Sequence, residues 1–528
     1  MAKMMGIIIP VIFLILLFTT TSWFEPVIFM VNVGIAIIIN MGTNLIFGEI
    51  CFITNTAGAI LQLACSMDYA IFLLERFEEF RKEGLQPEEA MVRAVARSTG
   101  SIASSGLTTV MGFVALTAMR FLIGPDMGLV LSKGIAISLV TTLVFMPCIT
   151  MFCYRLIDRT SHRSFLPSFH RLARGAVRIK GFVTVLVMLL LVPCYLAQRN
   201  IHFVYGASEM TGPESRIVRE RDAINDEFGE SNSFAILVPV GSTAKEQALN
   251  DDLKALPQVS SVLSYVETVG KSIPDAYVPP DQLKLLTAGG YTRMVVSARV
   301  PGESQETFRL VETMRSLARS YYGDEYYMVG VPATIYDMKD TITADSVKVN
   351  AISIGAIGLI LLINLRSISL PVLLLLTIES SIFINIAIPY FTGAHLQYIG
   401  YLIISSVQLG ATVDYAILFT NRYLELRAKL PRQEAVTETI RSTAGSILTS
   451  GGILATGGMV LRFGSSNLII GQRGVLVARG AVLSVVLVMV LLPTLLTRLE
   501  WLIKYTTRGL VLYQAPAESP EHPKEVTA

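Results

Sequence analysis

GATVDYAILF (410–419) and ACSMDYAIFL (64–73) each place an Asp-Tyr pair in the middle of a long apolar segment. An ionised Asp costs about 2.5–3.5 kcal/mol at the centre of a membrane helix, so intramembrane carboxyls are rare and are usually functional. This chain meets the same cost twice, at matching places. Asp68 and Asp414, with Tyr69 and Tyr415 beside them, are therefore candidates for groups that bind and release a proton or ion.

The composition around these motifs is that of an integral membrane protein. The 528-residue chain is 52% hydrophobic and 16% charged, whereas soluble domains carry about 25% charged residues. A net charge of +2 and the absence of a basic, aromatic-rich stripe predict no nucleic-acid partner. Five cysteines lie in or beside apolar segments without a CxxC spacing, which predicts packing residues and no metal or cofactor.

Eleven apolar segments predict a polytopic α-helical protein, because about 20 apolar residues cross a bilayer. The predicted spans are 6–22, 26–48, 52–74, 98–119, 127–153, 181–198, 347–364, 368–391, 396–420, 442–462 and 474–497. Lys and Arg gather after the third, fifth, ninth and eleventh spans. Alternating spans put these four stretches on one side, which we expect to be cytoplasmic, together with the C-terminus.

The polar segment 199–345 is then extracytoplasmic and long enough for a domain. Its hydrophobic alternation predicts an α+β layer with helices on one face of a sheet. The predicted strands are Phe234–Val240, Arg293–Val300 and Tyr326–Val331, and the predicted helices are 243–256 and 304–320. The charged segments 75–97 and 421–441 are expected to lie along the inner membrane face, with Phe77, Phe80 and Tyr423 turned toward lipid, or to be simply a charged, solvated surface.

The two halves of the chain repeat each other at an offset of 345 or 346 residues. Besides the Asp-Tyr pairs, Gly100-Ser101-Ile102 matches Gly445-Ser446-Ile447. Because the matching spans are six apart, they run in the same direction, which predicts a two-fold parallel repeat of helical bundles. The second copy has one more span and the outer domain. We therefore expect that a span and an outer domain precede Met1 in a longer protein, or come from another chain.

These features resemble the MMPL branch of the RND (resistance–nodulation–division) transporter superfamily. GATVDYAILFTNRY (410–423) is a specific match, and the resemblance covers nearly the whole chain. It implies an RND-type fold with a porter-like outer domain, and proton-driven export of lipids or other amphiphiles. On this basis the expected parts are a first membrane bundle 1–154, a basic cytoplasmic linker 155–180, the first span of the second repeat 181–198, a porter-like domain 199–345, a second membrane bundle 346–500 and a cytoplasmic tail 501–528.

Adjacent residues on a helix point about 100° apart, so Asp68 cannot pair with its own Tyr69. A pseudo-two-fold arrangement lets Asp68 meet Tyr415 and Tyr69 meet Asp414, and the resemblance implies the same pairing. Each Tyr hydroxyl can donate to a carboxylate and hold it in one rotamer. A carboxyl placed in this way can load a proton on one side of the membrane and unload it on the other.

Each of the other polar residues in the spans has two alternative roles. Ser101, Ser105, Ser446 and Ser450 either permit close helix packing or line a water path to the aspartates. Glu379 is either a second protonation or substrate site or a hydrogen-bonded structural residue. Lys133 and Arg479 either snorkel to the outer interface or bind a lipid headgroup.

The leading hypothesis is export of a hydrophobic or amphiphilic molecule across the cytoplasmic membrane, driven by protons. Its partners would be protons and a membrane lipid or amphiphilic small molecule. The alternatives are a non-transporting lipid-sensing or scaffold module, and an accessory of protein secretion similar to SecDF. An enzyme is not expected, because the sequence has no HExxH, GxSxG or Walker motif.

Overall fold

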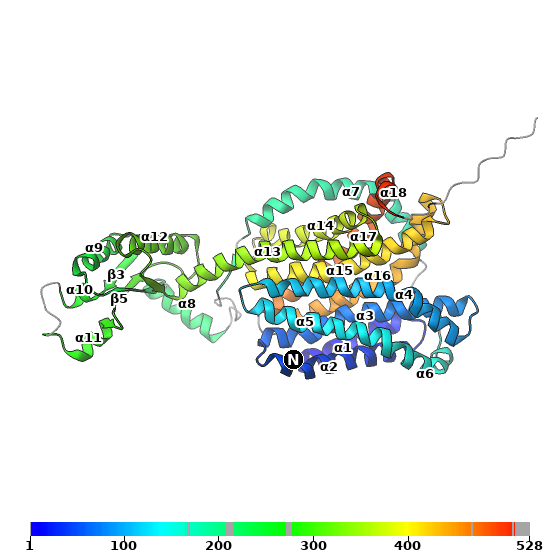
Figure 1. Ribbon diagram of the computed structural model, residues 1–528, viewed down its shortest axis with the longest axis horizontal. Helices are drawn as coiled ribbons and strands as arrows, with labels where there is room; N and C mark the ends of the chain where they lie inside the picture. Colours follow the sequence, from blue (N-terminus) through cyan, green and yellow to red (C-terminus); the bar gives the residue numbers. More distant parts are fainter. Residues whose placement is uncertain are drawn as a thin grey trace, which may run out of the picture.

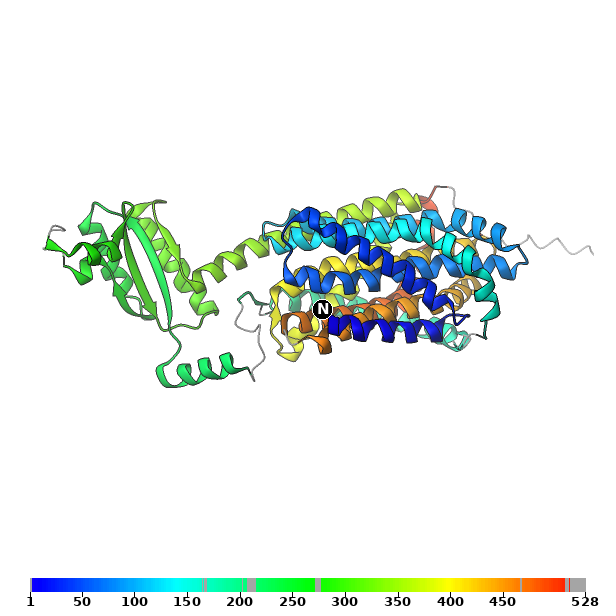
Figure 2. The same cartoon turned by 90° about the horizontal axis from the view of Figure 1, so that it is seen from below.

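A bundle of long helices and a small α+β domain lie end to end and are joined by α13 (Val331–Leu365) (Figures 1 and 2). The computed structural model describes residues 2–163, 165, 169–201, 203–206, 215–270, 277–465, 468–508 and 512. We call the end of the bundle that carries the α+β domain the domain end, and the opposite end the far end.

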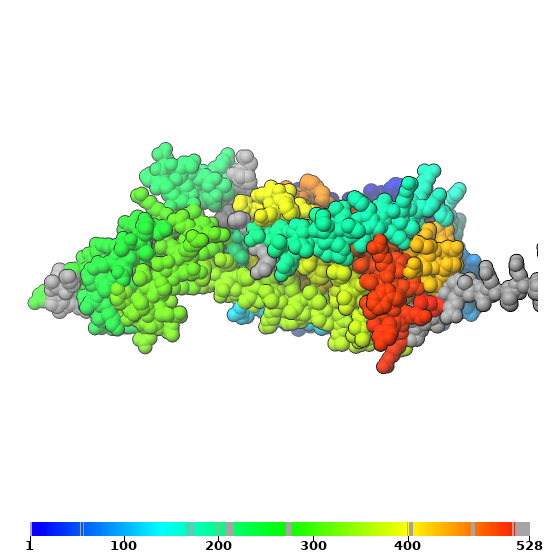
Figure 3. Space-filling view, turned by 90° about the horizontal axis from the view of Figure 1, so that it is seen from above, coloured from blue at the N-terminus to red at the C-terminus, as the bar shows by residue number. Residues whose placement is uncertain are grey.

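The bundle is built from two runs of helices, one before and one after the α+β domain in the sequence. The first run is α1 (Ala2–Thr19), α2 (Glu25–Gly42), η1 (Thr43–Phe47), α3 (Phe52–Lys82), α4 (Pro87–Val114), η2 (Ala115–Ala118), α5 (Ile123–Val140), η3 (Thr141–Phe145), α6 (Met146–Arg159) and α7 (His170–Arg199). The second run is α13, α14 (Ser369–Thr392), α15 (Tyr398–Arg427), α16 (Arg432–Gly464), α17 (Leu468–Arg498) and α18 (Glu500–Thr506). Figure 3 shows α7 along the outside of the bundle, where most of its side chains are exposed.

Among the described residues, nine helices are long and apolar enough to cross a membrane. The two other predicted spans, 6–22 and 396–420, fall on α1 and α15. The prediction of a polytopic helical membrane protein is confirmed. The most buried helices are α3, α15, α16 and α17, which form the centre of the bundle.

In the charged segments that follow the two motif helices, Phe77 and Tyr423 do not turn outward toward lipid, so that prediction was wrong. Helix α3 continues to Lys82 and α15 to Arg427, each as one unbroken helix. Phe77 is 4% exposed and Tyr423 is 1% exposed, so both rings pack inside the bundle. The charged side chains of one helix pair with those of the other, which allows both segments to pack together at the far end.

The α+β domain contains an antiparallel sheet in the order β3-β5-β2-β6, with β4 paired to β5. Its strands are β2 (Asn232–Pro239), β3 (Val259–Leu263), β4 (Thr287–Ala288), β5 (Tyr291–Ala298) and β6 (Tyr327–Val329). Its helices are α8 (Arg216–Phe228), α9 (Thr243–Lys254), α10 (Tyr265–Thr268), α11 (Pro280–Leu286) and α12 (Gln305–Tyr322). In the register, Phe234 lies opposite Val296 and Ile236 opposite Met294.

Alternate residues of β2 and β5 point to one face of this sheet and are buried there under α9 and α12. A period of two is what a strand with one covered face requires. Ser242 and Ser304 begin the two helices by accepting hydrogen bonds from the backbone of Lys245 and Thr307. The predicted α+β domain with helices on one sheet face is confirmed, although β3, β4, α8, α10 and α11 were not predicted.

Two carboxylates fasten the α+β domain to the bundle. Asp345 on α13 is 2% exposed and accepts hydrogen bonds from the backbone N–H groups of Arg120, at 2.6 Å, and Phe121, at 3.2 Å. Glu303 accepts from the backbone of Tyr205 and Gly206, just after α7. Beside it, β1 (Phe203–Val204) pairs in parallel with β7 (Leu396–Gln397).

Glycines bring helix backbones into contact where the central helices cross. The Cα of Gly410 on α15 lies 3.2 Å from where a Cβ on Gly112 of α4 would stand. On the other side of the bundle, a Cβ on Gly458 of α16 would meet the backbone of Gly474 and Ala478 on α17. Small residues of this kind permit close packing of membrane helices.

We expect Gly458→Ala to destabilise the protein by about 1–3 kcal/mol, because the added methyl group would force α16 and α17 apart. Gly452→Ala is the matched control on the same helix, since nothing lies within 4 Å of its Cβ position. There alanine should be neutral or stabilising, by up to about 1 kcal/mol. Thermal unfolding of both purified variants in one detergent measures the difference. Equal unfolding temperatures for Gly458→Ala and the unsubstituted protein would contradict the close crossing.

Candidate functional site

Each motif helix packs against the helix that follows the other motif. Helix α3, with Asp68 and Tyr69, contacts α16, and helix α15, with Asp414 and Tyr415, contacts α4. This packing between the two halves brings both Asp-Tyr pairs to one cavity of about 50 Å³ inside the bundle. The predicted hydroxyl residues line the same cavity: Ser101, Ser105, Ser446 and Ser450.

Asp414 lies beside hydroxyl groups of α4. The Tyr69 hydroxyl lies 3.2 Å from the Thr109 hydroxyl, which lies 3.3 Å from Oδ2 of Asp414. Thr109 thus lies between Tyr69 and Asp414, and its hydroxyl also lies 2.9 Å from the Gly410 carbonyl. The sequence analysis did not single out Thr109.

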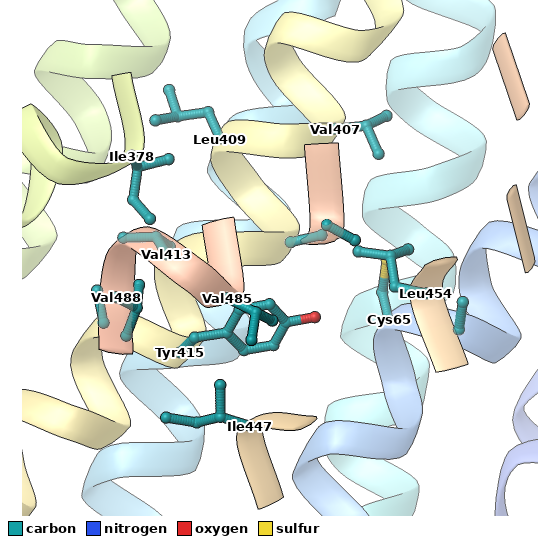
Figure 4. Close-up of a cluster of buried hydrophobic side chains, with 14 of the residues drawn as sticks. Cys65, Ile378, Val407, Leu409, Val413, Tyr415, Ile447, Leu454, Val485 and Val488 are labelled. Atoms are coloured by element: carbon teal, nitrogen blue, oxygen red, sulfur yellow. The ribbon is translucent and has the colours of Figure 1, made fainter. Parts of the chain in front are cut away.

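The other half of the site is arranged differently. The Tyr415 hydroxyl, Oδ1 of Asp68 and the Ser450 hydroxyl have no hydrogen-bond partner in the part of the chain that the structure describes. The residue 345 positions after Thr109 is Leu454, which cannot donate a hydrogen bond. Figure 4 shows the Tyr415 ring between Val485 and Ile447, with its hydroxyl pointing toward the side of Cys65 and Leu454. The two aspartates thus have different surroundings, which the repeat alone did not indicate.

Two buried amide networks hold the motif helices against their neighbours. Asn40 donates to Gln62 at 2.8 Å, and Gln62 donates to the carbonyl of Gly134 at 3.0 Å. Asn385 donates to Gln408, also at 2.8 Å, and the matching donation from Gln408 to Gly480 spans 3.4 Å. Asn40 and Asn385 are 345 positions apart, and Gln62 and Gln408 are 346 apart. A search of the repeat for matching polar residues would therefore have identified them.

A cavity of about 860 Å³ lies at the far end and shares Ser446, Phe72 and Leu418 with the lining of the inner cavity. Glu75 lines the larger cavity, and its Oε1 accepts a hydrogen bond of 2.7 Å from Ser446. Sequence reasoning did not find Glu75, because the residue 346 positions later is Asn421, which donates to Ser101 at 3.2 Å. Only one of the two equivalent contacts therefore contains a titratable group.

Four charged residues link the two halves at the far end. Arg76 lies 2.7 Å from Glu79 and 3.4 Å from Glu425, while Arg422 lies 3.0 Å from Glu425 and 3.2 Å from Glu79. We call this set the far-end quartet. Each arginine contacts a carboxylate of its own helix and one of the other helix.

The remaining predicted site residues lie away from the cavity. Lys133 donates to the Asn40 carbonyl at 3.0 Å and to the Asn44 side chain at 2.7 Å. Arg479 donates to the side chain and the carbonyl of Asn385, both at 2.7 Å. These bonds give both cations a structural partner, and a headgroup contact stays a prediction.

Glu379 on α14 is partly buried and does not line the cavity. It forms no hydrogen bond or ion pair with another described residue. Its role as a second protonation or substrate site stays a prediction.

A family model described as the MMPL family matches residues 1–180 and 209–502. The chain belongs to the MMPL family. This family is part of the RND superfamily, so the resemblance seen in the sequence is confirmed.

Several curated proteins are similar to this MMPL chain. Membrane protein YdfJ of Bacillus subtilis (strain 168) is 21% identical over 442 residues, which cover 80% of this chain and 59% of YdfJ. The apo-petrobactin exporter of Bacillus anthracis is 23% identical over 428 residues, covering 74% and 55% of the two chains. The hopanoid transporter HpnN of Rhodopseudomonas palustris (strain TIE-1) is 24% identical over 269 residues, covering 49% and 29%. The MMPL chain spans just over half the length of YdfJ and of the apo-petrobactin exporter.

Proposed function

We propose that this chain uses proton movement through the Asp68–Asp414 cavity to export a hydrophobic or amphiphilic molecule across the cytoplasmic membrane. The observation that carries the proposal is the meeting of two intramembrane carboxyls from separate halves of the bundle at one cavity. A cavity of about 50 Å³ has room for water, which a proton needs to reach a buried carboxyl. The family supports the proposal, as do the siderophore and hopanoid substrates for which two relatives are named.

The bundle is proposed to be a two-fold parallel repeat, with the segments bounded as the sequence predicts. The paired amide networks and the reciprocal far-end quartet support this arrangement, because each contact in one half has a counterpart in the other. The distribution of Lys and Arg favours a cytoplasmic far end and an outer α+β domain.

The proposed proton path starts in the cavity of about 860 Å³ at the far end. Glu75 takes up the proton there and passes it through Ser446 to the inner cavity. Ser446 lines both cavities. Hydroxyl donors favour a carboxylate. Asp414 has such a donor in Thr109, and both Asp414 and Asp68 are proposed to alternate between charged and neutral forms.

The change in charge is proposed to rock the two halves against each other. A proton crossing 100 mV supplies about 2.3 kcal/mol, which is comparable to the energy of a few surface ion pairs. The far-end quartet would separate when the halves rock. Asp345, which binds the turn after α4, would pass the movement to α13 and the outer domain.

Purified protein in proteoliposomes with an imposed pH gradient tests this function. A trapped pH-sensitive dye reports proton flux, and the surface accessibility of a headgroup-labelled lipid reports export. We expect flux that depends on the protein and lipid movement that depends on the gradient. A folded protein that moves neither would reject the proposal and favour a lipid-sensing or scaffold module.

A further inference from the structure

Arg473 is a buried cation that forms no ion pair with any described residue. It lies in the second turn of α17, at the domain end, and is 4% exposed. Its Nε, Nη1 and Nη2 atoms have no hydrogen-bond partner in the described ranges of the chain. A buried guanidinium that is neither paired nor hydrogen-bonded is costly, so a position of this kind indicates a partner that binds from outside the chain.

The side chain of Arg473 lies against the first turn of α15. Its Cγ is 3.5 Å from where a Cβ on Gly400, the third residue of that helix, would stand. The N-terminus of a helix carries a partial positive charge, and the first N–H groups have no acceptor within the helix. An arginine side chain that packs against a helix N-terminus favours an anion there, because both carry positive charge.

The equivalent helix start in the first half of the chain, that of α3, carries a negative charge. There Asp126 accepts the backbone N–H of Cys51, just before α3, at 3.0 Å. In the second half the neutral side chain of Gln472 accepts the backbone N–H of Gln397, just before α15, at 3.2 Å. The next residue is Met127 in the first half and Arg473 in the second. At the equivalent helix start, the first half therefore has one negative charge, on Asp126, and the second half has one positive charge, on Arg473.

Three other cations of the bundle, Lys133, Arg479 and Arg462, do not share this environment. Lys133 and Arg479 have their donors bound to asparagine residues of a neighbouring helix. Arg462, also at the domain end, is exposed. Arg473 is buried and has no acceptor among the described residues, so snorkelling does not explain it.

We infer that Arg473 and the first turn of α15 bind an oxyanion, a phosphate or carboxylate group, at the domain end of the bundle. The group comes either from the headgroup of an anionic amphiphile or from a free anion. The inference does not depend on proton coupling, because binding at this place requires no pH gradient and no titration of Asp68 or Asp414.

Thermal unfolding of the purified full chain in dodecyl maltoside tests the site with two probes. Dodecyl phosphate represents an anionic amphiphile, and inorganic phosphate represents a free anion. We expect dodecyl phosphate to raise the Tm of the unsubstituted protein by roughly 3 °C or more near saturation. A shift with dodecyl phosphate alone assigns the site to an amphiphile, and a shift with both probes assigns it to free oxyanions as well. No shift with either probe overturns the inference.

Arg473→Met installs the residue found at the matching position and removes the charge. It should raise the Tm without probe and weaken the binding of dodecyl phosphate at least ~30-fold. Arg473→Gln serves the same purpose if the methionine variant does not fold. Arg462→Met is the matched control and should keep the shift. A shift that persists in both Arg473 variants, or that is lost equally in Arg462→Met, overturns the inference.

Discussion

Asp414→Asn is expected to abolish proton flux and export while the protein still inserts and folds. Asparagine keeps the shape and can still accept from Thr109, but it cannot take up and release a proton. Because proton transfer by a placed side chain contributes ~100-fold or more, flux should fall at least by that factor. Asp68→Asn is expected to have the same effect, since both carboxyls line the cavity. Dye-loaded proteoliposomes with a pH gradient measure the flux of each variant.

Glu379→Gln is the matched control for this result. It removes a third intramembrane carboxyl, on α14, that does not line the cavity. Flux close to that of the unsubstituted protein is expected. Normal flux in Asp414→Asn, or equal losses in all three variants, would contradict the assignment of the proton site to the cavity.

Glu75→Gln is expected to slow proton flux by ~10-fold or more without abolishing it, because protons must then reach the inner cavity from the far end without a titratable relay. The hydrogen bond from Ser446 to residue 75 can still form, so helix packing should be unchanged. Initial rates of dye quenching at several pH values on the far-end side measure the effect.

Asn421→Ala provides the comparison for Glu75→Gln. It removes the equivalent contact in the other half, with Ser101, where no titratable group is present. We expect this variant to keep most of the flux. If Asn421→Ala loses as much as Glu75→Gln, both residues act through packing, and the proposed entry path is wrong.

The sequence predicted those parts of the site that depend on local chemistry. A carboxyl in an apolar segment is visible in a few residues, so Asp68 and Asp414 could be found, and the repeat indicated that their helices lie side by side. The hydroxyls on the next span followed from the same repeat. In the α+β domain, the hydrophobic pattern was enough to locate β2, β5, α9 and α12.

Contacts between distant residues with unlike counterparts could not be predicted. The repeat implied two equal Tyr–Asp pairings, but Thr109, which lies between Tyr69 and Asp414, has Leu454 as its counterpart in the other half. Glu75 bonds a serine 371 positions away. The charged ends of α3 and α15 were assigned to the membrane surface because charge alone indicates solvent, whereas the far-end quartet pairs these charges between helices.

The unbroken course of α13 sets how far the outer domain can travel. The helix has 35 residues and no proline beyond its first turn, so it acts as a stiff lever. At about 1.5 Å per residue it is roughly 50 Å long, and a tilt of ~5° about its inner end would displace its outer end by roughly 4 Å. A small rearrangement around a single proton could thus be amplified into a stroke large enough to open or close a passage for a lipid-sized cargo.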